Sequence, residues 1–246
     1  MSNHGLQMPE GVQVDETSAA EGQFVMGPLE RGYGVTIGNA LRRVLLSSLR
    51  GLAVTAVKID GVQHEFSTIP GVTEDVSDII LNLKEVRLKA DEMREGHLHL
   101  TLEGPGTWTA EDIGKSAAEY DVLNPEQHIA TLAEDAAVNV DLRIGYGRGY
   151  VPADENKRED DPIGVIAVDS IFTPIKNVKY EVTPTRVGQK IDFEELVLDV
   201  ETDGSINPEE AVTQAASILR EHVSFFIQLE EEPEPVVEEQ EVDEEV

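Results

Sequence analysis

The chain has 246 residues and a formal net charge of −30, with 40% apolar residues, 5% aromatic residues and no cysteine. This length and apolar content allow one or two domains with a buried core, which must rest on aliphatic side chains because aromatic ones are few. The lack of cysteine excludes disulfides, thiolate metal sites and a cysteine nucleophile.

The negative charge is spread over the whole chain. Glu230–Val246 holds ten acidic residues and no basic one, so the chain before Glu230 still carries −20. Affinity for nucleic acid comes from Lys and Arg side chains that displace counterions from phosphates, so this surface predicts no direct binding to DNA or RNA. The same acidity is also typical of a protein adapted to a salty cytoplasm, and this interpretation stays open.

Membrane and secretion signals are not found in this sequence. No segment approaches the ~18–20 consecutive apolar residues of a membrane-spanning helix. The first 25 residues lack a basic region followed by an apolar run, which a secretory signal requires. We therefore expect a soluble, cytoplasmic protein with no membrane contact.

The first predicted elements are a flexible start, a strand and a helix. Residues 1–14 are polar and turn-rich and are expected to be flexible, and Val14–Leu29 indicates a strand. From Thr36 to Leu49 apolar residues recur at helical spacing. Thr36 is the expected N-cap of this helix, and Gly51 is expected to stop it.

The middle of the chain is predicted to be rich in strands. Leu52–Ser67 forms two alternating runs around Asp60-Gly61, a dipeptide that suits a type I′ turn, and this predicts a β-hairpin. Glu74–Leu83 indicates a short helix, and the alternation in Val86–Leu102 indicates paired strands. Residues 145–164, rich in glycine and charge, are expected to form an exposed loop.

Strands and a long helix are expected at the end of the chain. Strands are predicted over residues 163–172, 176–187 and 196–201. Asn207-Pro208-Glu209-Glu210 then supplies a cap residue, a proline at the first helical position and acids in the first turn, so a helix is expected from there to about Leu229. The acidic, proline-interrupted residues 231–246 are expected to be disordered.

Catalytic and metal-binding patterns are absent from the sequence. His97 and His99 share one face of an expected strand and could chelate a metal, but two polar residues on a solvated strand face is the favoured interpretation. Gly145, Gly147 and Gly149 lack the lysine and the following helix of a phosphate-binding loop. We therefore predict no catalytic residue, no metal and no cofactor.

A basic segment interrupts this acidic chain. Arg31, Arg42, Arg43 and Arg50 fall in a stretch that contains no acidic residue. Arg43, Ser47 and Arg50 recur at helical spacing and predict a polar stripe beside the apolar face. Arginine is enriched at protein interfaces, so this helix could contact two partners at once. Ion pairs with the protein's own acidic surface explain the arginines equally well from composition alone.

The same segment carries a family resemblance. Leu29–Gly51, LERGYGVTIGNALRRVLLSSLRG, resembles the motif LERGxGxTLGNALRRxLLSS of bacterial RNA polymerase alpha subunits. The similarity continues through Val54–Lys84, Gly147–Ala153, PIGVIAVDSIFTPIKNVKYEV and DGSINPEEAVTQAASIL. It covers residues 15–230 in the order that the family has.

The resemblance implies an α+β fold. A discontinuous α/β dimerisation domain with two long helices, residues 15–50 plus 175–230, would be interrupted by a β-rich insert domain, residues 51–174. In the family the two helices of each protomer pack into a four-helix dimer core, which needs apolar faces such as those predicted above. The implied dimer-interface residues are Leu41, Val44, Leu45, Ile218, Leu219, Phe225 and Phe226.

The resemblance also implies partners. One protomer of the homodimer would dock the beta subunit of RNA polymerase and the other beta-prime, with large-subunit contacts at Arg42, Arg43, Leu46 and Lys84. The chain would then be a non-catalytic assembly subunit, part of a nucleotidyltransferase only within the complex, and cytoplasmic with access to the nucleoid through the polymerase. The alternatives are a homodimeric acidic binding module acting outside the polymerase and a stand-alone enzyme.

One departure from the family concerns the end of the sequence. Family members continue past an acidic linker into a small helical domain that contacts promoter DNA, whereas this sequence stops at Val246 in a segment similar to that linker. Either the sequence is truncated or the subunit lacks that domain. No DNA-contacting residue can therefore be carried over.

Overall fold

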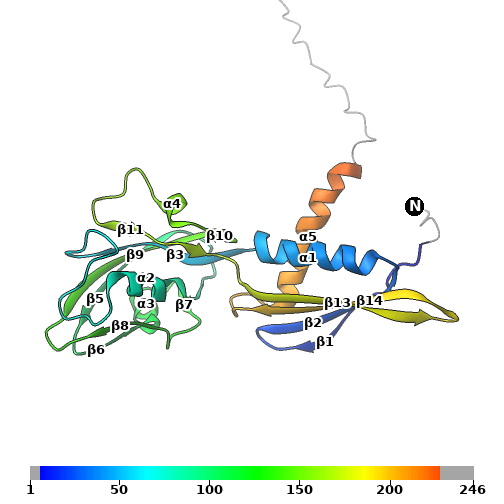
Figure 1. Ribbon diagram of the computed structural model, residues 1–246, viewed down its shortest axis with the longest axis horizontal. Helices are drawn as coiled ribbons and strands as arrows, with labels where there is room; N and C mark the ends of the chain where they lie inside the picture. Colours follow the sequence, from blue (N-terminus) through cyan, green and yellow to red (C-terminus); the bar gives the residue numbers. More distant parts are fainter. Residues whose placement is uncertain (1–5, 228–246) are drawn as a thin grey trace, which may run out of the picture.

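The computed structural model describes residues 6–227, which fold into two parts that lie end to end along the long axis of the molecule (Figure 1). A discontinuous domain takes residues from both ends of this range, and an insert domain takes the residues between them. This arrangement confirms the predicted fold class, an α+β fold with a discontinuous domain interrupted by a β-rich insert.

The discontinuous domain is built on a four-stranded antiparallel sheet with the order β1-β2-β14-β13. Its strands are β1 (Gly11–Thr17), β2 (Glu21–Glu30), β13 (Ile175–Val187) and β14 (Lys190–Thr202). Buried residues of neighbouring strands face each other, as where Phe24 of β2 pairs with Leu198 of β14. The helices α1 (Tyr33–Ser48) and α5 (Pro208–Ile227) cover one face of this sheet (Figure 1).

The insert domain is built on a six-stranded sheet whose central strand is β3 (Arg50–Ile59). The other strands of this sheet are β4 (Leu88–Lys89), β5 (Gly96–Glu103), β7 (Asp121–Val122), β9 (Ala137–Arg148) and β11 (Val165–Ala167). Two short ladders pair β6 (Gly106–Thr109) with β8 (His128–Leu132) and β10 (Tyr150–Val151) with β12 (Ser170–Ile171). The helices of the insert are α2 (Val76–Lys84), α3 (Ala110–Ser116) and α4 (Ala153–Asn156).

Each domain has its own hydrophobic core. The core of the insert draws only on residues from Leu52 to Val168, and the core of the discontinuous domain draws on residues from Phe24 to Ala215. In the latter, Leu45 of α1 and Leu49, which directly follows this helix, are fully buried together with alanines of α5. Helix α1 lies very close to the sheet because Gly38 faces it; a Cβ there would lie only 2.7 Å from Cδ2 of Tyr180.

The predicted start of the first helix is wrong, whereas its predicted end at Leu49, the C-cap, is confirmed to within one residue. Helix α1 begins at Tyr33, and its N-cap is Gly32, with a φ of 90° that favours glycine. Thr36 lies inside the first turn, where its Oγ1 donates to the carbonyl of Gly32 at 3.0 Å. The helix ends at Ser48, and Gly51 lies in β3, where a Cβ would stand 2.1 Å from the carbonyl oxygen of Phe172.

The hairpin predicted around Asp60-Gly61 is also wrong. Gly61 does turn the chain, with a φ of 82° and a hydrogen bond from Val62 N to Ile59 O of 3.1 Å. However, β3 pairs with β9, β4 and β11, all distant in sequence, and not with the residues that follow the turn. Because β3 is buried along nearly its whole length, long-range packing decides its neighbours and local turn chemistry does not.

Other predicted boundaries are also wrong, because long-range strand pairing decides them. Gly11–Val14, expected to be flexible, belongs to β1, which pairs with β2. The strands β4 and β5 of Val86–Leu102 each join the large sheet and do not pair with each other. Gly145–Arg148 extends β9 and is not loop. The expected helix end at Leu229 and the acidic residues 231–246 lie outside the described residues.

A buried ion pair anchors the segment that follows β9. Arg143 is 6% exposed, and its guanidinium donates to Asp161 Oδ1 at 2.5 Å, to the carbonyl of Asn156 at 2.8 Å and to Thr55 Oγ1 at 3.3 Å. The hydrogen bonds from Arg143 lower the pKa of the Asp161 carboxyl group. Asn156 in turn donates to Val168 O at 2.8 Å and so ties α4 to the end of β11. This charged segment is therefore held on the sheet.

We predict that Leu45→Ala destabilises the protomer core. The substitution should lower the free energy of unfolding by about 2–5 kcal/mol, because it removes a fully buried side chain and leaves a cavity between α1 and the sheet. Urea denaturation followed by circular dichroism measures the change. Asn39→Ala, at an exposed position of the same helix, is the control; equal stability of the two variants would contradict the packing described here.

We also predict that Asp161→Asn makes stability depend less on pH. A carboxyl group with a lowered pKa stabilises the fold above its unfolded pKa of about 3.9, and this contribution is lost as pH falls through the lowered value. At pH 7 the variant should have a free energy of unfolding lower by on the order of 3 kcal/mol, because the buried Arg143 guanidinium loses its counter-charge. The difference in unfolding free energy between the variant and the wild-type chain should narrow below about pH 4. Urea titrations at several pH values test this, and a gap that stays constant would refute it.

Candidate functional site

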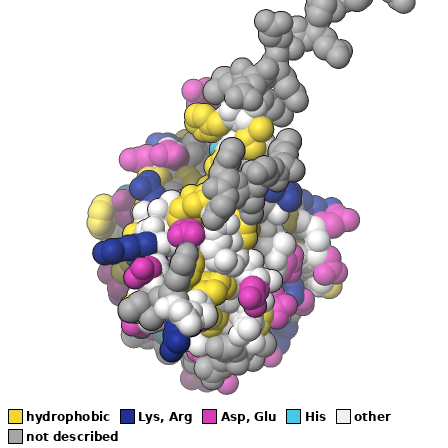
Figure 2. Space-filling view, turned by 90° about the vertical axis from the view of Figure 1, so that its right-hand side faces the viewer, with side chains coloured by type: hydrophobic (Ala, Val, Ile, Leu, Met, Phe, Trp, Pro, Cys, Tyr) yellow, Lys and Arg dark blue, Asp and Glu magenta, His cyan; other side chains and the backbone are white. Residues whose placement is uncertain are grey.

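An apolar helix end projects from the discontinuous domain. The first half of α5 packs on the sheet through the buried Ala211 and Ala215. Near its end, Phe225, Phe226 and Ile227 are 70%, 75% and 73% exposed. Helix α5 crosses α1 and rises away from the sheet (Figure 1), and hydrophobic side chains, in yellow, show toward the top of the molecule (Figure 2). Several large exposed apolar groups in one place indicate a surface that another molecule covers.

A groove runs beside the base of the same helix. It has a volume of about 440 Å³ and lies between β1 and α5, with Val12, Val14, Phe24 and Val212 among its lining residues. Val12 and Val14 are exposed and point to one face of β1. Sequence reasoning missed both, although their alternation with polar residues is a strand signal. The groove is therefore a second partly apolar surface of this domain, at the opposite end of α5 from Phe225 and Phe226.

The predicted dimer-interface residues fall into three groups. Phe225 and Phe226 are exposed at the projecting end of α5. Leu41, Val44, Ile218 and Leu219 are half-buried. The prediction for Leu45 is wrong, because this side chain is fully buried within its own protomer and holds α1 to the sheet. Helical periodicity gave the apolar face of α1 but could not distinguish core from interface.

The arginines of α1 divide between an internal and an external role. Arg42 donates from Nε to the carbonyl of Val178 in β13 at 3.2 Å, so it braces α1 against its own sheet. Leu46 is half-buried and packs against the core of the discontinuous domain. Arg43 is exposed, and no carboxylate of residues 6–227 lies within 4.0 Å of it. Of these three predicted contact residues, Arg43 is the most available to a partner.

Lys84 lies in a groove of the insert domain, far from α1 in sequence. Its Nζ pairs with Asp169 Oδ2 at 2.7 Å, and the second oxygen of Asp169 accepts from Ala153 N at 2.8 Å. The hydrogen bond from Lys84 is the main reason why the pKa of Asp169 is lowered. The groove measures about 500 Å³ and is also lined by Phe66 and Leu81, of which Phe66 is 80% exposed. Sequence reasoning placed Phe66 in the predicted hairpin and missed it as a site residue, whereas the structure places it in a turn.

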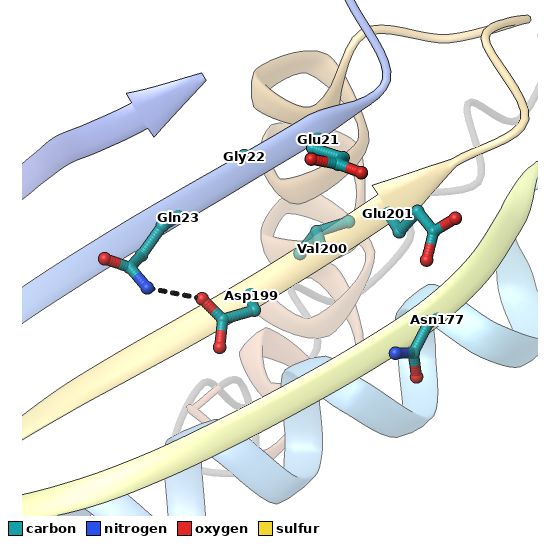
Figure 3. Close-up of a pocket in the computed structure, with 7 residues that line it drawn as sticks. All are labelled: Glu21, Gly22, Gln23, Asn177, Asp199, Val200 and Glu201. Carbon is teal, nitrogen blue, oxygen red and sulfur yellow. Dashed lines mark hydrogen bonds between the residues drawn. The ribbon is translucent and has the colours of Figure 1, made fainter. Parts of the chain in front are cut away.

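A polar hollow lies on the outer face of the sheet of the discontinuous domain (Figure 3). It measures about 210 Å³, and the side chains of Glu21, Asp199 and Glu201 line it without a basic residue. Gln23 Nε2 donates to Asp199 Oδ1 at 2.6 Å and crosses from β2 to β14. The hollow faces away from both helices, so it has no part in the apolar surfaces described above.

The described part of the chain offers neither a cluster of metal ligands nor a membrane-spanning helix. His99 pairs with Asp141 at 2.7 Å on the solvent side of the insert sheet. Among residues 6–227, no group of three or more His, Asp or Glu side chains is placed to hold a metal ion. None of the helices in this range combines the length and hydropathy needed to span a bilayer.

Comparison with family models agrees with the two domains. The model of the RNA polymerase Rpb3/RpoA insert domain matches residues 57–173, and that of the RNA polymerase Rpb3/Rpb11 dimerisation domain matches residues 128–223. The two matches overlap over residues 128–173. Strand pairing assigns these shared residues to the insert domain, because β8 pairs with β6 and β9 pairs with β3 and β5, all in that domain.

Individual relatives are similar over most of the chain. DNA-directed RNA polymerase subunit alpha of Salinibacter ruber is 87% identical over 246 residues, which is 100% of this chain and 75% of the relative. The subunits named in the same way from Prosthecochloris aestuarii and Chlorobaculum tepidum are 59% and 56% identical over 90% of this chain and 68% of each relative. These matches lend no support to a binding module acting outside the polymerase. The identity over the whole length, together with both domain matches, shows that this chain belongs to the family of bacterial DNA-directed RNA polymerase alpha subunits.

Proposed function

We propose that the chain assembles RNA polymerase by forming a homodimer that holds the beta and beta-prime subunits. The observation that supports this most strongly is the apolar end of α5, which has no cover within the described protomer. The dimer would use this end of α5 and the groove beside β1. The large subunits would use the exposed Arg43 and the groove around Lys84. The chain would contribute to nucleotidyl transfer only through the complex.

A second copy of the chain is the partner that best fits the α5 surface. A two-fold interface presents the same patch from both protomers, so an apolar patch can cover itself. Each large apolar side chain contributes roughly 1.5–3 kcal/mol when it becomes fully buried. Burial of these side chains from both copies is therefore sufficient to offset much of the entropic cost of association. They are Phe225, Phe226 and Ile227. The match to a dimerisation domain supports the same partner.

The proposed large-subunit surfaces differ in chemistry. Arg43 offers an exposed guanidinium that is not used by its own protomer's described carboxylates, which suits an acidic or carbonyl-rich partner. The groove of the insert offers the exposed ring of Phe66 beside the Lys84–Asp169 ion pair, which suits a mixed apolar and polar segment. Two such surfaces on one protomer support a role in bringing together larger proteins.

Direct DNA binding is not part of the proposed function. The chain before Glu230 carries −20, and the acidic hollow in Figure 3 adds to a field that repels phosphates. Non-specific affinity for DNA grows with the number of phosphates that a protein neutralises. The basic residues of the α1 segment are too few to offset this field. Contacts with promoter DNA would therefore come from other parts of the polymerase.

We predict that Phe226→Asp yields monomers. The substitution would place a charge in the proposed apolar interface, and an unpaired buried charge is far more costly than the loss of one contact. Light scattering coupled to size-exclusion chromatography measures the mass of the particle. Phe66→Asp is a matched control, because Phe66 has a similar exposure but lies on the insert domain. A dimer of normal stability in the Phe226→Asp chain would mean that α5 faces something else.

We predict that Arg43→Ala leaves the dimer intact but weakens capture of the beta subunit. Removal of a central arginine from an interface costs on the order of 2 kcal/mol, which is about a 30-fold loss of affinity. Co-purification and titration with the beta subunit of the same organism measure this loss. Arg94→Ala is the control, since Arg94 is also an exposed arginine but lies outside α1 and pairs with Glu119. Wild-type affinity in the Arg43→Ala chain would remove Arg43 from the proposed contact.

A further inference from the structure

Strands β3 and β9 hold two arginines directly opposite each other. Arg50, the first residue of β3, is the register partner of Arg148, the last residue of β9. Both are exposed. Like charges that face each other across an antiparallel pair destabilise the sheet. The position of this pair is therefore unfavourable for the isolated protomer and needs an explanation.

Neither arginine has a counter-ion within the described chain. No carboxylate whose side chain the structure describes lies within 4.0 Å of Arg50 or Arg148, although the chain holds 49 acidic and only 19 basic residues. Elsewhere in the insert such partners are common, as for Lys84 with Asp169, Arg143 with Asp161 and Arg158 with Glu95. Other basic residues, such as Arg43 and Lys58, also lack such a partner. What distinguishes Arg50 and Arg148 is that they also lie directly opposite each other.

The backbone beneath the pair is tightly packed. Gly149 follows Arg148 with a φ of 61°, and its carbonyl accepts hydrogen bonds from Phe172 N at 2.8 Å and Thr173 N at 3.2 Å. Gly51 and Gly147 pack closely against Phe172, where a Cβ would stand 2.1 Å and 2.7 Å from its nearest atoms. Because neighbouring residues of a strand point to opposite faces, the arginines lie on the face away from Phe172. The two guanidinium groups are thus presented from a rigid base.

The pair continues the surface of Arg43. Ser47 lies one turn after Arg43 on α1, and its Oγ donates to the Arg43 carbonyl at 2.8 Å. The backbone of Gly149 lies against Ser47, since a Cβ on Gly149 would stand 3.4 Å from the Ser47 carbonyl oxygen. Tyr146, two residues before Arg148, is exposed on the same face of β9. Arginine and tyrosine together are typical of the residues that dominate binding energy at interfaces.

We propose that Arg50 and Arg148 form a carboxylate-binding site for an acidic segment of the large subunit that contacts Arg43. This inference rests on the proposed function. A carboxylate placed between the two guanidinium groups would accept charge-assisted hydrogen bonds from both and remove their mutual repulsion. A nucleic-acid phosphate is the less favoured ligand, because the net charge of −30 opposes a polyanion over a longer range than the pair can attract it.

The test combines stability of the free dimer with affinity for the beta subunit. In Arg148→Gln and in Arg50→Gln, loss of the repulsion should raise the melting temperature of the free dimer slightly. Each variant should nevertheless bind the beta subunit roughly 10-fold more weakly, with a shallower dependence on salt. Because both arginines would hold the same carboxylate, the double variant should lose much less than the product of the two single losses. Arg94→Gln serves as the control and should leave the affinity unchanged.

Several outcomes would overturn this inference. A lower melting temperature with unchanged affinity would give the pair a purely internal role. If removal of Glu230–Val246 abolished the effect of Arg148→Gln, the chain's own acidic segment would be the ligand. Binding of a promoter duplex at low salt that Arg148→Gln abolished would assign the site to phosphate. Failure of the wild-type dimer to bind the beta subunit would instead reject the proposed function. Normal binding that depends on Arg43 but not on Arg148 would reject only this site.

Discussion

The pairing of β2 with β14 is the interaction on which the rest of the structure depends. It joins the two separated segments of the discontinuous domain, as the hydrogen bond between Gln23 and Asp199, 176 positions apart, illustrates. On one face of this pairing lie Phe24 and Leu198, which form the floor on which Leu45 and α5 pack. The cost of closing a long connection grows only with the logarithm of its length, so a whole insert domain is tolerated between the paired strands.

This constraint also explains why α5 presents an apolar end. The sheet is wide enough to cover the first half of the helix, where Ala211 and Ala215 allow close approach. The second half extends past α1, and no further layer of the described residues lies under it (Figure 1). A helix of this length is stable because its first half is anchored, and it carries the aromatic side chains of its second half out to a partner.

The sequence predicted the strongly periodic elements well and the long-range pairings poorly. Helical periodicity and the Asn207-Pro208 start signal located α1 and α5 to within a few residues, because both signals act locally. The neighbours of β3 were missed because a strand buried on both faces can pair with any apolar strand, and only tertiary packing selects among them. For the same reason no local pattern could show that Arg50 faces Arg148, since their relation exists only through the register of β3 and β9.

For the candidate site residues too, the sequence predicted the local pattern but not the burial that packing decides. Phe225 and Phe226 are exposed on α5, and their place in a dimer interface stays a prediction. The sequence could not tell that Leu45, also on an apolar helix face, is fully buried. Val12 and Phe66 were missed because the sequence pattern does not show whether an apolar residue will be buried, and only their exposure in the folded chain marks them.

The projecting end of α5 has a consequence for the life of the chain before assembly. A protomer that has not met a second copy keeps aromatic rings in water at the tip of a helix, where they can contact any other apolar surface. If α5 forms the dimer, folding and association are linked by mass action, and the fraction of intact particles falls on dilution. Newly made chains would then be most vulnerable to proteases and aggregation while their concentration is low, and synthesis of many copies close together would shorten that interval.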